Sequence, residues 1–314
     1  MPRIKYRLRF PSSVYAAITA GSRLYVGGSV WDRRKVEYSK EIAKKTKGVV
    51  YVLHKQDLED TVFFPHMVYS LLGLPSRKIF VGCKDTARTF NLIDRTGAIL
   101  KQKDDKIGKG CYNAVFDSRK REILVPTRSG KLEILDTNLR IKKKLQLASA
   151  KTRLWSVDFD SSNIYTGDYD GNLFVVDRKR FKKIGEVNLK KFYPGDKRLK
   201  KGFGPSLWGL KITGNRIITG NRWGDIIVFN KKLQAEHRIN AGEDVSCIEK
   251  LSKQILLIGT RYGKLYSFDL KTGKLRKITE IKPTLQKENA IWGMTHAKDG
   301  VLVCWADGVI CKII

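Results

Sequence analysis

The residues with the clearest chemistry in this sequence are basic and aromatic side chains that stand next to each other at turn signals. The tripeptides Arg222-Trp223-Gly224 and 261–263 (Arg-Tyr-Gly) each follow a short apolar run. Glycine suits the geometry of a tight turn, but a turn has no need of arginine beside a large aromatic residue. Guanidinium groups bind phosphates or carboxylates, and aromatic rings stack on bases or anchor protein partners. The pattern therefore predicts a binding surface.

The charge balance of the chain points to a partner of negative charge. The 314 residues contain 62 Lys and Arg against 31 Asp and Glu, which gives a net charge of +31. The 30% of charged residues suggests a hyperthermophilic origin, but thermophilic ion-pair networks would raise acids and bases together. Because so large an excess of one sign costs self-repulsion, an anionic partner explains it better.

One stretch of the chain shows how the elements that position these residues are organised. Residues 154–159 alternate apolar and polar side chains, which is the period of a half-buried strand. Residues 164–166 begin a second strand, Asp170 and Gly171 signal a tight hairpin, and residues 172–176 form a third strand. The stretch is therefore interpreted as one unit of a β-sheet protein.

The same unit recurs seven times along the chain. Each copy contains a residue that starts a strand and, further along the chain, a hydrophobic triplet. A Gly follows this triplet, except in two copies where Pro126 or Cys304 stands in its place. Repeats of roughly 40 to 50 residues with three or four short strands indicate a β-propeller, because one blade cannot bury both faces of its sheet. The residues that begin the units are Tyr15, Tyr69, Tyr112, Trp155, Trp208, Ser246 and Trp292.

The ends of the chain predict how the ring closes. The last unit stops one strand short, whereas residues 4–10 alternate apolar and basic side chains before the first unit. We expect this N-terminal strand to complete the last blade beside residues 309–314, which removes an open sheet edge. The predicted fold is all-β, a single seven-bladed β-propeller of four-stranded blades over residues 1–314. Its blades are expected near 11–66, 67–110, 111–153, 154–206, 207–244, 245–290, and 291–314 plus 1–10.

Several strings in the second half of the chain resemble WD-repeat units. They are WSVDF, YTGDYDGNLFVVD, WGLKI, ITGNRWGDIIVF and IGTRYGKLYSFDLKTGKL, the last of which also resembles the repeats of quinoprotein-like propellers. The Trp-Asp pair that names the WD family is absent, since Val176-Asp177 and Phe268-Asp269 stand in its place, and the Trp-docking motifs of quinoproteins are absent too. The resemblance implies the architecture, because propellers carry unrelated activities.

The resemblance to WD propellers also implies which end of the ring binds. In such propellers the connections from outer strand to next inner strand, and from second to third strand, open at one end. The insertion 31–47 and the connectors 101–110, 190–204 and 282–290 would all lie there. We therefore expect a positively charged disc with aromatic residues around the channel.

This disc predicts binding of nucleic acid, with RNA favoured over DNA, or of a ribonucleoprotein. A flat disc has no helix to enter a DNA major groove, whereas splayed bases can lie on aromatic rings. The expected phosphate-binding residues are Arg33, Arg34, Lys35, Lys84, Arg88, Arg128, Lys197, Arg198, Lys200, Lys201, Arg222 and Arg261. The expected stacking residues are Trp31, Tyr169, Tyr193, Trp223, Tyr262 and Trp305.

The main alternative is a WD-repeat-type protein-interaction scaffold with an acidic protein partner. The same Arg and aromatic side chains would then be interface anchors. The aromatic residues that begin the units can instead pack between blades, whereas those at hairpin tips are expected to be exposed. The lysine-rich run 140–145 is interpreted as an outer strand that its charges protect from edge pairing.

An enzyme is the third possibility, and the sequence carries no motif for one. The histidines are His54, His66, His237 and His296, and they show no paired metal-ligand spacing. The sequence contains neither a phosphate-binding loop nor a nucleophile elbow. We therefore expect a protein that is not an enzyme and that uses no metal and no cofactor.

The cysteines and the N-terminus bear on the compartment. The number of cysteines is odd and none has CxxC spacing, so we interpret them as small buried hydrophobic residues in a reducing compartment. They are Cys83, Cys111, Cys247, Cys304 and Cys311. A disulfide between the last two is a minor alternative. No apolar run approaches the length of a membrane span, and the N-terminus lacks the apolar core of a leader. We expect a soluble cytoplasmic protein that is a monomer when free.

Overall fold

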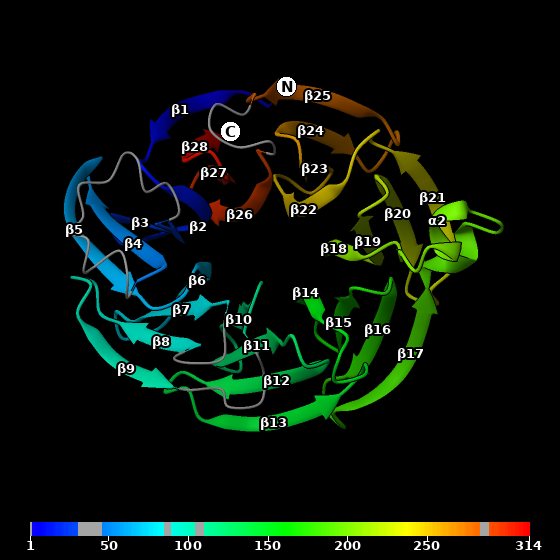
Figure 1. Cartoon of the computed structure of the whole chain (residues 1–314), viewed down its shortest axis with the longest axis horizontal. Helices are drawn as coiled ribbons and strands as arrows, with labels where there is room; N and C mark the ends of the chain where they lie inside the picture. Colours follow the sequence, from blue (N-terminus) through cyan, green and yellow to red (C-terminus); the bar gives the residue numbers. More distant parts are fainter. Residues whose placement is uncertain (1, 31–45, 85–88, 104–109, 283–288) are drawn as a thin grey trace.

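The computed structural model of the protein describes residues 2–30, 46–84, 89–103, 110–282 and 289–314. These residues form seven four-stranded sheets, in each of which neighbouring strands are antiparallel. Figure 1 shows the sheets as blades of a ring around a central channel. The prediction of an all-β, seven-bladed propeller is therefore confirmed.

Within each blade the strands follow one another from the channel to the rim. Those of blades one to three are β2 (Ser13–Ala20), β3 (Arg23–Ser29), β4 (Gly48–His54) and β5 (Asp57–Phe64); β6 (Val68–Gly73), β7 (Ile79–Cys83), β8 (Phe90–Ile93) and β9 (Ile99–Lys103); and β10 (Val115–Asp117), β11 (Glu122–Pro126), β12 (Lys131–Asp136) and β13 (Ile141–Gln146). Those of blades four to six are β14 (Leu154–Phe159), β15 (Asn163–Asp168), β16 (Asn172–Asp177) and β17 (Lys182–Asn188); β18 (Leu207–Thr213), β19 (Arg216–Asn221), β20 (Asp225–Asn230) and β21 (Ala235–Asn240); and β22 (Val245–Lys250), β23 (Ile255–Thr260), β24 (Lys264–Asp269) and β25 (Leu275–Glu280).

Blade seven is completed by the N-terminus, as the sequence predicts. It contains β26 (Ile291–Ala297), β27 (Gly300–Trp305), β28 (Val309–Ile313) and, at the rim, β1 (Ile4–Arg9). Strand β1 pairs antiparallel with β28 in the register Leu8 to Ile310. The backbone N–H of Phe10 then donates to the carbonyl of Gly308 at 2.7 Å. The two ends of the chain therefore close the ring through one sheet.

The glycine that ends most hydrophobic triplets is explained by the contact between blades. Gly167 and Gly220 lie in the second strands of blades four and five. A Cβ atom at Gly167 would overlap the side chain of Leu207, and one at Gly220 would overlap Val245. Each of these contacted residues begins the inner strand of the next blade. The repeated glycine therefore records how closely neighbouring blades approach.

The outer strands differ from the middle strands in burial. Every residue of β7 is buried, because neighbouring strands and blades cover it, whereas β13 has three consecutive exposed lysines, Lys142, Lys143 and Lys144. Strand β13 is the rim strand of blade three. The interpretation of this lysine-rich run as an outer strand is therefore confirmed.

The five cysteines are buried and none forms a disulfide. Cys304 pairs across the sheet with Ile310, while Cys311 pairs with Val303. Because adjacent register positions point to opposite faces of a sheet, the two sulfur atoms belong to different hydrophobic clusters on either side of blade seven. The interpretation as buried hydrophobic residues is confirmed, and the disulfide alternative is wrong.

Two short helices interrupt the connector between blades four and five. They are the 3-10 helix η1 (Leu189–Phe192) and the helix α2 (Lys197–Lys200). Asn188 and Asp196 cap them by accepting backbone N–H groups of Lys190 and Arg198, at 2.8 Å each. In the part of the chain that the structure describes, no helix is long and apolar enough to cross a membrane.

Candidate binding face at the channel mouth

The hairpins between second and third strands share one end of the ring with the connectors between blades. In blades five and six the residue after the outer strand donates its N–H to a hairpin glycine, from Ala241 to Gly224 at 2.8 Å and from Ile281 to Gly263 at 3.2 Å. These glycines have φ values of +87° and +91°, which an L side chain rarely adopts. The expected clustering of loops at one end is present in these blades, and we call this end the mouth.

One backbone position recurs around the mouth. The first residue after the second strand of a blade, or the second residue in blade three, donates its N–H to the connector that precedes the same blade's inner strand. The donor and acceptor pairs are Lys84 to Met67 (3.0 Å), Arg128 to Gly110 (3.4 Å), Tyr169 to Arg153 (2.9 Å), Arg222 to Ser206 (2.9 Å), Arg261 to Asp244 (2.9 Å) and Ala306 to Ala290 (2.9 Å). Side chains at this position are therefore held at equivalent places around the channel.

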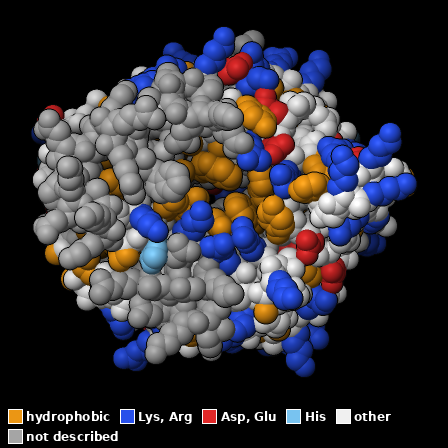
Figure 2. All heavy atoms as spheres, in the orientation of Figure 1, with side chains coloured by type: hydrophobic (Ala, Val, Ile, Leu, Met, Phe, Trp, Pro, Cys, Tyr) orange, Lys and Arg blue, Asp and Glu red, His pale blue; other side chains and the backbone are white. Residues whose placement is uncertain are grey.

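The aromatic residues at or just before the start of the inner strands pack on one another in the channel. We call them the mouth aromatics: Tyr15, Tyr69, Tyr112, Trp155, Trp208 and Trp292. The ring centroids of Tyr15 and Tyr69 are 4.6 Å apart, and those of Tyr112 and Trp155 are 3.9 Å apart. Trp208 lies 5.7 Å from Trp155 by the same measure. Figure 2 shows hydrophobic side chains at the centre of this face, with Lys and Arg beside them. These rings therefore pack on one another around the channel, which differs from the expected packing between blades.

Basic side chains cover the faces of these rings. Lys84 Nζ lies 6.0 Å from the Tyr69 ring centroid, and the guanidinium of Arg128 lies 5.6 Å from that of Tyr112. Such placements are favourable cation–π contacts. The guanidinium of Arg261 lies 5.8 Å from the centroid of Trp208.

Blades four and five add two arginines to this arrangement. Arg222 donates to the Tyr169 hydroxyl at 3.1 Å, and the guanidinium of Arg153 lies 5.8 Å from the ring centroid of the same tyrosine. Sequence reasoning missed Arg153, although a basic residue immediately before an inner strand was a usable signal. We call Lys84, Arg128, Arg153, Arg222 and Arg261 the mouth cations.

A carboxylate is part of the mouth as well. Asp244 lies 3.3 Å from a guanidinium nitrogen of Arg261. Burial raises the pKa of Asp244, and the nearby charges of Arg261 and Arg222 only partly offset this rise. The mouth cations together therefore carry more positive charge than the single carboxylate of Asp244 can neutralise.

The other predicted phosphate-binding residues gather on the connector at the rim. Lys197, Arg198, Lys200 and Lys201 are exposed and lie on or just after α2, which Figure 1 places beside β21. We call residues 189–203 the rim arm. The structure thus places the described members of the predicted phosphate-binding set in two groups, one at the mouth and one on the rim arm. The two groups meet where the guanidinium of Arg222 lies 5.6 Å from the ring centroid of Phe203.

Two predicted stacking residues are corrected by their burial. Trp305 is 0% exposed because it ends strand β27 and packs between blades six and seven, where its indole N–H donates to Gly263 O at 2.9 Å. Tyr193 is 5% exposed because the rim arm folds back onto blade five. Its hydroxyl donates to Asp225 and accepts from Asn221. The prediction that these two rings stack on bases is wrong.

The remaining predicted stacking residues differ in how open they are. Trp223 is half-buried, with the guanidinium of Arg198 4.0 Å from its centroid and the Tyr193 ring edge-on at 4.5 Å. Tyr169 is half-buried beside Arg222, whereas Tyr262 is 46% exposed. The predicted residues Trp31, Arg33, Arg34, Lys35 and Arg88 lie outside the described residues.

Comparison with known proteins identifies the fold. No protein-family model and no curated protein sequence matches the chain. Among solved structures, the WD40 β-propeller domain of Doa1 is similar, with a TM-score of 0.75 and 11% sequence identity over 100% of this chain and 97% of that one. The resemblance to WD-repeat propellers is therefore confirmed at the level of architecture. Within the described ranges, no group of three or more His, Cys, Asp and Glu side chains could hold a metal ion.

Proposed function

We propose that the protein is a non-catalytic scaffold whose mouth binds an acidic segment of a partner protein. The observation that carries this proposal is that each mouth cation lies against an aromatic ring. All of them except Arg153, which lies on the connector before blade four, also hold equivalent backbone positions around the channel. An arginine guanidinium binds a carboxylate through two parallel hydrogen bonds. The aromatic centre of the face offers apolar surface for the anchor residues of a peptide.

The burial of the aromatic residues favours a polypeptide over RNA. Base stacking needs an open ring face, but Trp305 and Tyr193 are buried and one face of Trp223 is covered by Arg198. Carboxylate recognition needs only the cations. Single-stranded RNA remains the competing function, because a net charge of +31 and the exposed ring of Tyr262 favour phosphates and bases.

The test compares the two ligands on the same protein by fluorescence anisotropy. The probes are a labelled 15-residue peptide rich in Glu and Leu and a labelled 15-nucleotide oligouridine, each titrated at several salt concentrations. We expect tighter binding of the peptide, and loss of that binding in Arg222→Ala/Arg261→Ala.

The matched control removes two cations elsewhere. Arg180→Ala/Lys183→Ala changes the net charge equally, but these side chains are exposed at the rim of blade four. Its peptide affinity should stay close to that of the unchanged protein. Tighter binding of oligouridine, or equal losses in both double variants, would assign the face to nucleic acid or to unspecific charge attraction.

A further inference from the structure

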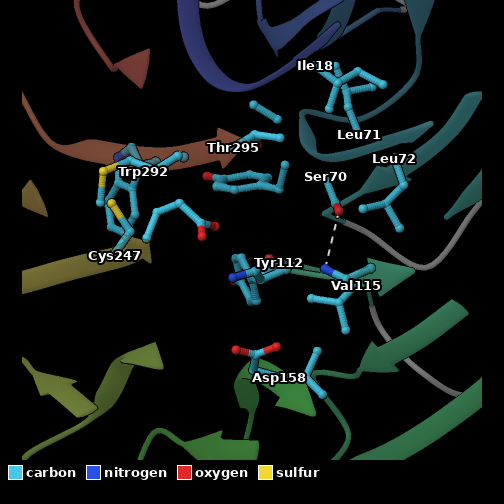
Figure 3. A pocket seen from close by; sticks show the side chains of 18 of the residues that line it. Ile18, Ser70, Leu71, Leu72, Tyr112, Val115, Asp158, Cys247, Trp292 and Thr295 are labelled. Carbon is cyan, nitrogen blue, oxygen red and sulfur yellow. Dashed lines mark hydrogen bonds between the residues drawn. The ribbon is translucent and has the colours of Figure 1, made fainter. Parts of the chain in front are cut away.

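A cavity of about 410 Å³ lies in the channel below the mouth aromatics. Residues from all seven inner strands line it, among them Tyr112, Trp208 and Trp292. Figure 3 shows an open space at its centre, into which Asp158 points its carboxylate. The volume falls within the range of roughly 300 to 1,000 Å³ that is typical of small-molecule sites.

The two sides of the cavity have different chemistry. The third residue after the one that begins each unit lines it in every blade. In blades one to three these residues are Ile18, Leu72 and Val115, which lie along one side in Figure 3. In blades four to six they are Asp158, Lys211 and Glu249. An apolar wall therefore faces a charged one.

The charged wall holds two carboxylates and one ammonium. Lys211 Nζ lies 2.7 Å from Glu249 Oε1 but 3.9 Å from Asp158 Oδ2. The longer distance is an ion pair without a hydrogen bond. Asp158 instead accepts the backbone N–H groups of Phe159 at 2.9 Å and Ile212 at 2.8 Å. Each carboxylate oxygen has two lone pairs, so Asp158 has capacity for a further donor.

The electrostatics of the wall fit this geometry. Burial raises the pKa of Asp158, and the charge of Lys211 only partly offsets the rise. A buried carboxylate with this balance is under-neutralised. A second cation in the cavity would therefore stabilise the ionised form of Asp158.

Trp208 adds an aromatic surface to the cavity. It lines the cavity and is 5% exposed. Its indole nitrogen is buried and has no hydrogen-bond acceptor among the described residues, but it is not open to the cavity. Trp208 therefore offers the cavity its ring and not its N–H group.

The cavity has access to solvent away from the mouth. Gly73 ends strand β6, and His296 lies next to the end of β26. Both residues line the cavity and both are exposed. The mouth aromatics stand at the other end of these strands, so this end of the cavity borders exposed residues away from the binding face.

We propose that this channel cavity binds a small organic ammonium ligand that has an apolar body. The ammonium donates to Asp158 and Glu249, and the apolar body lies against Ile18, Leu72 and Val115. The site lies below the mouth, shares aromatic rings with it, and does not depend on the proposed scaffold function.

Isothermal titration calorimetry with three matched probes tests this site. Tyramine carries the ammonium, 4-(2-hydroxyethyl)phenol is its neutral counterpart, and 3-(4-hydroxyphenyl)propionate is its anionic counterpart. We expect tyramine to bind at least about tenfold more tightly than either of the others, because only its charge complements Asp158. Equal binding of the three probes, or no heat of tyramine binding up to millimolar concentrations, overturns the proposal.

Two variants locate the binding. Asp158→Asn keeps an oxygen acceptor for the backbone and should weaken tyramine binding about tenfold or more. Leu72→Trp fills the cavity from the opposite wall and should abolish binding, so it decides the matter even where Asp158→Asn does not fold. Arg222→Ala should bind tyramine normally while its affinity for the acidic peptide falls. Undiminished tyramine affinity in folded Asp158→Asn or in Leu72→Trp overturns the proposal.

Discussion

The mouth and the rim arm are both rich in basic residues, but the fold prepares them differently for binding. Arg128, Arg222 and Arg261 are half-buried, with their backbones fixed by hydrogen bonds and their guanidinium groups against aromatic rings or a tyrosine hydroxyl. Lys197 and Lys200 of the rim arm are exposed. Ordering an exposed lysine on binding costs conformational entropy that a preorganised arginine has already lost on folding. The mouth arginines are therefore predicted to contribute more to the affinity for a partner than the rim-arm lysines, although each side chain carries the same charge.

The carboxylates of the two regions differ in the same sense. Asp168, at the end of the second strand of blade four, is buried and accepts the N–H groups of Asp170 and Asn172. Burial raises the pKa of Asp168 to about 6. On the rim arm, the side chain and N–H of Arg198 both bind Asp196 and lower its pKa to about 2. Burial dominates near the mouth, whereas an exposed pairing dominates on the arm.

The largest expected effect is on peptide binding at the mouth. Arg222→Ala/Arg261→Ala should lower the affinity for the acidic peptide by a factor on the order of 100. The double substitution removes two preorganised guanidinium groups that bind carboxylates. Anisotropy titration at fixed salt measures this loss. A loss below about threefold would remove the distinction between mouth and arm.

The next effect concerns the pH dependence of stability. The folded pKa of Asp168 lies above its unfolded value, so its contribution is fully present below about pH 4 and is lost as the pH rises through about 6. The loss is on the order of 2 to 3 kcal/mol in the free energy of unfolding. Urea unfolding between pH 4 and 7 should show a weaker pH dependence in Asp168→Asn than in the unchanged protein.

Asp196 is a control for that experiment, because its pKa is shifted in the opposite direction from that of Asp168. Its folded pKa is lowered, so its contribution is present above about pH 4 and is lost as the pH falls towards about 2. Asp196→Asn should therefore leave the dependence between pH 4 and 7 unchanged. A shared pH profile for the two variants would contradict the contrast between burial and exposed pairing.

A smaller effect is expected when the rim arm loses its anchor. Arg198→Ala removes the cation–π contact with Trp223 and the ion pair with Asp196, and it should lower the free energy of unfolding by about 0.5 to 1 kcal/mol. Peptide affinity should hardly change. Thermal unfolding of Arg198→Ala beside Lys200→Ala, which removes the same charge from the same helix, separates the loss of these two contacts from the loss of charge.

The smallest effect belongs to the exposed lysines of the arm. Lys197→Ala/Lys200→Ala/Lys201→Ala should reduce peptide affinity only about two- to threefold at low salt and have no effect at high salt, where exposed charges are screened. Titrations at two salt concentrations measure this difference. An effect as large as that of the mouth double variant would show that the arm is the main binding surface.

Local signals made the architecture predictable. Alternation with period two, hairpin glycines such as Gly224, and the triplet-ending glycines such as Gly220 each reflect a constraint that acts at one place and recurs in other blades. The alternation in residues 4–10 likewise predicted the strand that closes blade seven. Repetition turns weak signals of this kind into a firm prediction of the fold.

The exposure of individual side chains was predicted less well. Trp305 and Trp223 both belong to turn-like strings, yet one is buried between blades and the other lies under Arg198 of the rim arm. Tyr193 was expected on an open connector but hydrogen-bonds inside blade five. In each case the covering residue comes from a segment far away in the sequence, so no local pattern could show it.

The sequence by itself determined the number of blades, the closing strand and the excess of positive charge, because alternation, turn residues and composition are local properties. Only the tertiary structure decided which cations are preorganised and which aromatic rings are buried. It alone placed Asp158, Lys211 and Glu249 on one wall of a cavity. These residues come from three blades, and their electrostatics depend on distances that exist only once the ring has closed.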